Sequence, residues 1–265
     1  MNRPLPIGVL MLLAADVGNT ETVLGVFDGD SLVQTWRLST QPERSADELA
    51  LVLSGLLEHR SLSLEKLTGL CVASVVPDVT LQLRDLAARY LPFDPVIVGP
   101  GTKTGVSILT DNPREVGADR IVNTLAAFTR FGGPAIVVDF GTGTNFDVVS
   151  SSGEFLGGVI APGLQISAAT LMQRAARLTR VELEAPPSVI GTSTVTAIQS
   201  GLVYGTAGEV DGIVARIRSE LGPATTIATG GLAPVVIPHC RTIDHHEPFL
   251  TLEGLRLVHG KNVDG

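Results

Sequence analysis

One pattern occurs twice along the chain and constrains its fold more than any other feature. Residues 12–32, LLAADVGNTETVLGVFDGDSL, contain an apolar run, an aspartate, a glycine turn, a second apolar run and another glycine turn. Residues 135–158, AIVVDFGTGTNFDVVSSSGEFLGG, repeat this order. A strand–turn–strand unit that occurs twice indicates a duplicated α/β architecture, and we expect both polar turns to open into a cleft between the two halves.

Hydrophobic periodicity and turn residues predict strands and helices in both halves. The predicted strands are residues 10–15, 22–27, 31–38, 70–76, 95–98, 135–139 and 225–228. The predicted helices are 45–60, 79–90, 111–131, 165–178 and 195–221. Ser45 and Glu48 form a capping box at the first helix, and Asp111-Asn112-Pro113 supplies a cap and a proline start for the third. Each half of the chain begins with one copy of the repeated pattern, and no proline- and serine-rich linker or run of charges separates the halves. We therefore expect an N-terminal subdomain at 1–131 and a C-terminal subdomain at 132–265.

The composition limits the classes of protein to which the chain can belong. Of its 265 residues, 44% are hydrophobic and 17% are charged, which is typical of a globular protein with a substantial core. The net charge is −8 and no stretch gathers the basic residues of a nucleic-acid surface, so no nucleic-acid partner is expected. The apolar run at 7–15 is too short to span a bilayer, and no cleavage site follows it. We therefore expect a strand there, with Met11 as an alternative start, and no membrane association.

Cysteine and histidine usage argues against a structural metal site. Cys71 and Cys240 lie far apart and form no Cys-x-x-Cys pair, which excludes a cysteine-rich zinc site and favours a reducing, cytoplasmic compartment. The sequence Asp-His-His-Glu at 244–247 contains metal-ligating residue types, but a solvated loop is the simpler interpretation.

The residue types in the repeated turns suit a nucleotide triphosphate. Residues 18–20 and 141–144 combine glycines, which allow close approach, with backbone and hydroxyl donors. Asp16 and Asp139 precede these turns and can hold Mg²⁺ through water or bind a monovalent cation. Each Asp-x-Gly alone would also fit an ordinary β-turn. Two in register, with a third glycine turn at 229–231, favour the functional interpretation.

Asp119 and Arg120 stand side by side after a Gly-Ala pair, in or near the first turn of a predicted helix. An acid there is stabilised by the helix dipole, so a purely structural role is one interpretation. In the other, Asp119 takes a proton from an attacking hydroxyl and Arg120 stabilises charge on the transferred group or the acceptor. Spacing alone leaves both interpretations open.

With these motifs the sequence resembles the type III pantothenate kinases, which belong to the actin-like (ribonuclease H-like) ATPase superfamily. The resemblance covers nearly the whole chain and rests on DVGNT at 16–20, LCVASVVP at 70–77, DNPREVGADRIVN at 111–123, DFGTGTNFDVV at 139–149, IGTSTVTAIQSG at 190–201 and ATGGLA at 228–233. It implies two mixed-sheet subdomains around a central cleft. It also implies phosphorylation of the primary hydroxyl of pantothenate by ATP to 4'-phosphopantothenate, the first step of coenzyme A biosynthesis.

The resemblance assigns roles to individual residues. It implies that ATP is bound by Asp16, Val17, Gly18, Asn19, Thr20, Glu21, Thr22, Val23 and Thr142, and pantothenate by Thr110, Gly117, Ala118, Asp119, Arg120 and Thr194. Asp119 would be the general base, with Arg120 as the clamp. Asp16 would hold Mg²⁺ through water, and Asp139 would bind the monovalent cation, K⁺ or NH₄⁺, that the family requires. Thr194 would reach pantothenate across the interface of a homodimer.

Three positions depart from the family pattern. Thr110 stands where family members usually have a tyrosine that lines the pantothenate pocket, so the pocket would be wider or bind its acceptor less tightly. Gly143 and Asn145 replace the alanine and the last threonine of the usual Gly-Thr-Ala-Thr-Thr turn. These departures lower the turnover that we expect but leave every carboxylate of the predicted site in place.

Two alternative functions fit the same fold. A non-catalytic, nucleotide-binding regulatory accessory factor would be expected to lose a carboxylate, whereas Asp16, Asp119 and Asp139 are all present. A sugar kinase of the superfamily often carries a Cys/His zinc element or longer insertions, and this sequence has neither. Both comparisons favour the pantothenate kinase.

Overall fold

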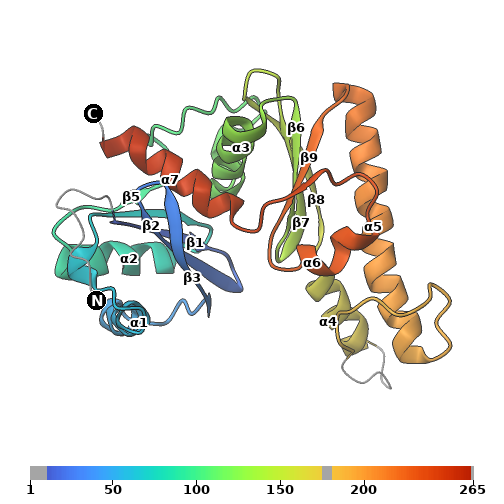
Figure 1. Ribbon diagram of the computed structural model, residues 1–265, viewed down its shortest axis with the longest axis horizontal. Helices are drawn as coiled ribbons and strands as arrows, with labels where there is room; N and C mark the ends of the chain where they lie inside the picture. Colours follow the sequence, from blue (N-terminus) through green and yellow to red (C-terminus); the bar gives the residue numbers. More distant parts are fainter. Residues whose placement is uncertain (1–10, 175–180, 264–265) are drawn as a thin grey trace. The chain divides into compact units, whose positions relative to one another are not determined.

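The computed structural model describes residues 11–174 and 181–263, and its contacts divide the chain into two compact units (Figure 1). The first unit comprises the chain up to residue 105, residues 114–125 and the chain from 251 onward. The second comprises 106–113 and 126–250. The predicted strand at 10–15 and the predicted helix at 165–178 each extend beyond the described residues.

A five-stranded mixed sheet forms the centre of the first unit. Its strands are β1 (Met11–Val17), β2 (Glu21–Asp28), β3 (Ser31–Ser39), β4 (Gly69–Ser74) and β5 (Val96–Ile97). Their order is β3-β2-β1-β4-β5; β1, β2 and β3 are antiparallel neighbours, whereas β4 runs parallel to both β1 and β5. The central strand β1 is almost entirely buried, which explains why its sequence is a continuous apolar run.

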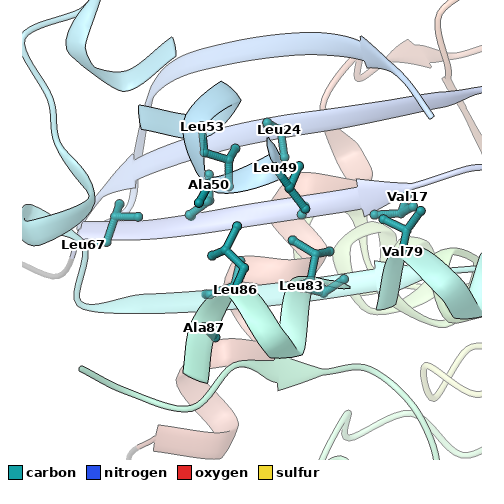
Figure 2. Close-up of a cluster of buried hydrophobic side chains, with 14 of the residues drawn as sticks. Val17, Leu24, Leu49, Ala50, Leu53, Leu67, Val79, Leu83, Leu86 and Ala87 are labelled. Atoms are coloured by element: carbon teal, nitrogen blue, oxygen red, sulfur yellow. The ribbon is translucent and has the colours of Figure 1, made fainter. Parts of the chain in front are cut away.

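Two helices cover this sheet with their apolar faces. They are α1 (Ala46–Glu58) and α2 (Pro77–Tyr90), and the predicted capping box of Ser45 and Glu48 is present at the start of α1. Figure 2 shows Leu53 of α1 and Leu86 of α2 in one cluster with Leu24 of β2. Burying such side chains stabilises the unit by about 1.5–3 kcal/mol each.

The second unit repeats the topology of the first. Its strands are β6 (Ala135–Phe140), β7 (Gly143–Val149), β8 (Phe155–Pro162), β9 (Thr225–Thr229) and β10 (His245–His246). They are ordered β8-β7-β6-β9-β10, with antiparallel pairs between β8, β7 and β6 and parallel pairs between β6, β9 and β10. Each strand of the first sheet thus has a counterpart in the second. The duplication predicted from the repeated sequence pattern is confirmed.

The helices of the second unit pack against this sheet around an apolar cluster that includes Phe146 and Val210. They are α4 (Leu164–Arg174), α5 (Thr194–Leu221) and the short α6 (Ala233–Val236). Three 3-10 helices, at Leu64–Lys66, Pro113–Glu115 and Ile237–His239, complete the connections among the described residues.

Helices α3 (Ala118–Phe131) and α7 (Leu250–Val263) differ most from the prediction. The helix expected over 111–131 is wrong at its start, because a separate 3-10 helix covers Pro113–Glu115 and α3 begins only after Gly117. Glycine is disfavoured inside a helix, and here it marks the boundary. The sequence patterns predicted no element for α7. Its residues from 251 onward belong to the first unit rather than to the C-terminal half, and α3 passes from the first unit to the second after residue 125.

None of the helices within residues 11–174 and 181–263 combines the length and the hydrophobicity that crossing a membrane requires.

Candidate active site

The first predicted turn follows strand β1. Asp16 is the last residue but one of β1, is half-buried and lies in register with Val23 of β2. Residues 18–20 connect the two strands, and the Gly18 amide donates a hydrogen bond of 3.0 Å to the Glu21 carbonyl. A β-carbon on Gly18 would lie 3.1 Å from that oxygen, so the narrow turn favours glycine.

Among the other residues of the segment from Asp16 to Val23, some are buried in the core and some are exposed. Val17 is buried in the core, whereas Asn19 and Thr20 are exposed. Glu21 is exposed and forms an ion pair with Arg37 of β3. The segment predicted to bind ATP therefore presents polar residues at the carboxyl end of β1, on a strand fixed by the core.

Thr40, which the sequence patterns did not identify, contacts the same turn from the end of β3. Its hydroxyl lies 2.7 Å from the Gly18 carbonyl and 2.9 Å from the Thr22 hydroxyl, and its amide donates to the Thr20 carbonyl at 3.0 Å. A threonine two residues after the predicted strand at 31–38 is the sequence signal that could have found it.

Asp119 lies in the first turn of α3, where Gly117 accepts the hydrogen bond of the Ile121 amide at 3.3 Å. The residue as a whole is half-buried, but its Oδ1 atom is buried and has no hydrogen-bond partner within the described part of the chain. Burial raises the pKa of the Asp119 carboxyl, and the Arg120 amide and charge counteract this by a smaller amount. An acid that is buried and still has an available oxygen atom is suited to accept a proton.

The neighbours of Asp119 shape the space around its carboxylate. A β-carbon on Gly117 would lie 2.4 Å from Oδ1, so a glycine is needed for the carboxylate to occupy this position. Ala118 is buried and Arg120 is half-buried in the same turn. The structure thus brings Gly117, Ala118, Asp119 and Arg120 together at one helix start, as the sequence predicted.

The second predicted turn follows strand β6 in the other unit. Asp139 is again the last residue but one of its strand, in register with Asn145 of β7 and Thr229 of β9. The Gly141 amide donates to the Gly143 carbonyl at 3.0 Å, which closes the turn around the exposed Thr142.

Two glycines pack closely against this turn. A β-carbon on Gly230, whose φ is +93°, would lie 2.5 Å from Asp139 Oδ1, and one on Gly163 would lie 2.1 Å from the Thr142 carbonyl oxygen. Any residue larger than glycine at 230 would displace the Asp139 carboxylate, and any at 163 would displace the Thr142 carbonyl. Such oxygen atoms are the ligands that hard cations prefer.

The remaining predicted residues of the second unit are Thr110 and Thr194. Thr110 Oγ1 is buried without a hydrogen-bond partner among the described residues, and its methyl group lies beside Gly157. Thr194 is the exposed first residue of α5, directly after Ser193, whose hydroxyl caps the helix by accepting from the Thr196 amide at 3.1 Å. The predicted site residues thus divide between the units: Asp16 to Val23 and Gly117 to Arg120 lie in the first, and Thr110, Asp139, Thr142 and Thr194 in the second.

The Asp-His-His-Glu sequence at 244–247 forms no metal cluster. Across residues 11–174 and 181–263, no three histidine, cysteine or acidic side chains are arranged to hold a metal ion. His245 and His246 form the exposed edge strand β10 rather than the predicted loop, and the His245 ring stacks on Phe131 with centroids 4.6 Å apart. Cys71 and Cys240 are both free thiols.

Comparison with known proteins identifies relatives of this arrangement. The family model described as type III pantothenate kinase matches residues 12–216. A type III pantothenate kinase from Frankia alni is 59% identical over 256 residues, which cover 96% of this chain and 100% of the relative.

Two solved structures show the same fold at low sequence identity. A Campylobacter jejuni protein described as a Baf family transcriptional activator gives a TM-score of 0.57 at 19% identity, covering 96% of this chain and 100% of that one. A ROK family glucokinase from Streptomyces griseus, in complex with glucose and AMPPNP, gives 0.51 at 12% identity, covering 97% and 100%. With the repeated sheet topology, these similarities confirm the predicted duplicated actin-like α/β fold. Since the family model covers most of the chain and a relative of that name shares more than half of its residues, the chain belongs to the type III pantothenate kinases.

Proposed function

We propose that this chain transfers the γ-phosphoryl group of ATP to the primary hydroxyl of pantothenate, yielding 4'-phosphopantothenate and ADP. This is the first step of coenzyme A biosynthesis. Family membership supports the assignment, and one observation carries the chemistry: the buried Asp119 Oδ1 atom, which has no partner among the described residues, at the start of α3. Burying a polar oxygen atom without a hydrogen bond costs free energy, and a non-catalytic accessory factor would not need it.

Asp119 acts as the general base in this proposal. The acceptor hydroxyl gives its proton to the Asp119 carboxylate as its oxygen forms a bond to the γ-phosphorus, and the bond to the β-phosphate oxygen breaks. Because burial raises the pKa of Asp119, the carboxylate holds the proton better than an exposed aspartate would. The Arg120 guanidinium clamps the anionic acceptor or the phosphoryl group.

The nucleotide is held by Asp16 to Val23 and by Thr142. In the first unit, the turn at 18–20 offers amide and hydroxyl donors to phosphate oxygens, and glycine at 18 allows the narrow turn that presents them. The half-buried Asp16 carboxylate at the end of β1 suits Mg²⁺, held through water. When bound with ATP, Mg²⁺ neutralises part of the phosphate charge.

Asp139 is the proposed ligand of a monovalent cation, K⁺ or NH₄⁺. The Asp139 carboxylate packs against Gly230 and the Thr142 carbonyl against Gly163, and both groups supply the oxygen atoms that bind such a cation. A cation there supplies positive charge near the phosphate-binding turn of the second unit, while Asp139 holds it in position.

A homodimer would complete the pantothenate site through Thr194. Next to Thr194, the side chains of Val189, Ile190 and Val195 are 66%, 78% and 42% exposed, a concentration of apolar surface that a second copy could cover. The segment before α5 is held in place, since Ser200 donates to the Val189 carbonyl at 2.6 Å and Tyr204 to the Pro186 carbonyl at 2.8 Å. We also infer a cytoplasmic location from the two free thiols.

The proposal is tested by incubating the purified chain with ATP, pantothenate, Mg²⁺ and K⁺. We expect ADP and 4'-phosphopantothenate in equal amounts, and much slower release of ADP when pantothenate is omitted or Na⁺ replaces K⁺. Asp119→Asn should reduce kcat by about 10²–10⁴-fold while ADP still binds, because a general base contributes about that factor. An accessory factor would bind ADP and form no phosphopantothenate under any of these conditions.

A further inference from the structure

We infer that Thr40 is a positioning residue for the nucleotide phosphates, a role that rests on the proposed function of the turn at 18–20. Thr40 lies directly after β3, outside the segment predicted to bind ATP. Its side chain contacts the turn at 18–20. Its hydroxyl and its amide hold two carbonyl groups of that turn.

Among the described residues, Thr40 makes three hydrogen bonds, all to residues of the first unit. The Thr40 hydroxyl lies 2.7 Å from the Gly18 carbonyl oxygen and 2.9 Å from the Thr22 hydroxyl. The Thr40 amide donates to the Thr20 carbonyl at 3.0 Å. One residue therefore anchors the first and last residues of the turn and the strand that follows it.

Proton counting fixes the direction of this chain of hydrogen bonds. A threonine hydroxyl has one proton to donate. The Thr40 hydroxyl donates its proton to the Gly18 carbonyl, so in its contact with Thr22 it must accept. Thr22 therefore donates to Thr40 and Thr40 donates to Gly18. The Thr22 hydroxyl proton is used within the fold, which leaves only its lone pairs for a ligand.

The planarity of the peptide bond links these contacts to phosphate binding. The Gly18 carbonyl and the Asn19 amide belong to one trans peptide unit, so they point in opposite directions. Holding the Gly18 carbonyl on Thr40 directs the Asn19 N–H away from Thr40, at an exposed position of the turn. A peptide flip would reverse this, placing a carbonyl oxygen where the turn should offer a donor to a phosphate. The Thr40 hydroxyl thus favours the orientation in which the turn attracts an anion.

A valine and a serine variant separate this role from a general effect on folding. Thr40→Val has nearly the same shape but no hydroxyl, whereas Thr40→Ser retains the hydroxyl. Thr35→Val is the matched control, because Thr35 lies half-buried on β3, the strand that Thr40 follows, and its hydroxyl makes no hydrogen bond within the described residues. Each variant is assayed for kcat, for the KM values of ATP and pantothenate, and for its melting temperature without ligand.

We expect Thr40→Val to raise the KM for ATP by about fivefold or more, the factor for the loss of one hydrogen bond. The KM for pantothenate should stay within about twofold of wild type, and Thr40→Ser and Thr35→Val should behave like wild type. Should Thr40→Val fail to fold, Thr40→Ala removes the same hydroxyl and carries the same expectation.

The inference is overturned if the variants without the Thr40 hydroxyl keep the wild-type KM for ATP, or if both KM values rise in parallel with a lower melting temperature. It is also overturned if Thr40→Ser is as impaired as Thr40→Val. Failure of the proposed function is a separate result, since wild-type protein would then form no phosphopantothenate in the same assay.

Discussion

The carboxylate of Asp119 lies so close to Gly117 that a β-carbon on Gly117 would stand 2.4 Å from Asp119 Oδ1. No real β-carbon approaches an oxygen atom this closely, so any other residue at 117 must displace the carboxylate or the helix start. The position of the Asp119 carboxylate therefore depends on the absence of a side chain at Gly117. Misplacing a catalytic group by about 1 Å can reduce a rate by about 10²-fold.

Gly117→Ala should accordingly lower kcat by about 10²-fold, because the added methyl group moves the Asp119 carboxylate from the acceptor hydroxyl. Steady-state kinetics with ATP and pantothenate would measure this. Gly55→Ala is the control, since Gly55 is an exposed residue of α1 with nothing within 4 Å of an added β-carbon. It should leave kcat unchanged and stabilise the protein by about 0.5–1 kcal/mol. Equal activity of the two alanine variants would contradict the role assigned to Gly117.

The pH dependence of kcat should report the environment of Asp119. Burial raises the pKa of this carboxyl above its ordinary value of 3.8, so activity should fall with decreasing pH at a higher pH than for an exposed aspartate. The charge of Arg120 lowers this pKa. Arg120→Gln should therefore move the acidic limb of the profile to higher pH, besides reducing the rate. A limb that stays in place in Arg120→Gln would contradict the electrostatic effect of Arg120 on Asp119.

The burial that raises the pKa of Asp119 also predicts that its ionised carboxylate destabilises the folded protein. A carboxyl whose pKa is higher in the folded than in the unfolded state stabilises the fold only while it is protonated, and this contribution is lost as the pH rises through the folded pKa. Asp119→Asn should therefore raise the free energy of unfolding at pH 7, with a smaller gain as the pH falls toward 3.8. Urea unfolding at several pH values measures the difference. The control Asp85→Asn, at an exposed position of α2, should change stability by less than about 0.5 kcal/mol. A destabilised Asp119→Asn protein at pH 7 would refute this account.

The parts of the fold that follow from local sequence were predictable. Asp16 and Asp139 occupy the same place, the last residue but one of β1 and of β6, and this equivalence is visible in the repeated sequence pattern. Strand alternation, glycine turns and the capping box at Ser45 are likewise properties of neighbouring residues. The positions of Asp119 and Gly117 at a helix start also follow from nearby residues, although the sequence placed that start too early.

Features that depend on distant contacts could not be predicted in this way. Helix α7 contains Gly254 and Gly260, which lower helix propensity. A β-carbon on Gly254 would lie 2.2 Å from the Val122 carbonyl oxygen, so this glycine serves close packing against α3, a reason absent from its local sequence. Thr40 binds the Gly18 carbonyl across 22 residues of sequence, and no periodicity reveals such a contact.

Gly230 packs against the carboxylate of Asp139, the proposed ligand of the monovalent cation. Gly230 has a φ of +93°, and a β-carbon there would lie 2.5 Å from Asp139 Oδ1 and 2.6 Å from the Phe140 backbone nitrogen. Gly230→Ala should therefore shift the Asp139 carboxylate, and the K⁺ concentration for half-maximal activity should rise by about tenfold or more. Activity measured against K⁺ concentration, at saturating ATP and pantothenate, tests this.

Gly208→Ala is the matched control for that experiment, because Gly208 is an exposed residue of α5 with open space around an added β-carbon. Its K⁺ dependence should equal that of wild type. The strained φ at 230 alone destabilises the alanine variant by about 1–2 kcal/mol, and the clash with the Phe140 backbone adds to this, so both variants are assayed well below their melting temperatures. If folded Gly230→Ala protein loses kcat but keeps the wild-type K⁺ dependence, the cation is bound elsewhere than at Asp139.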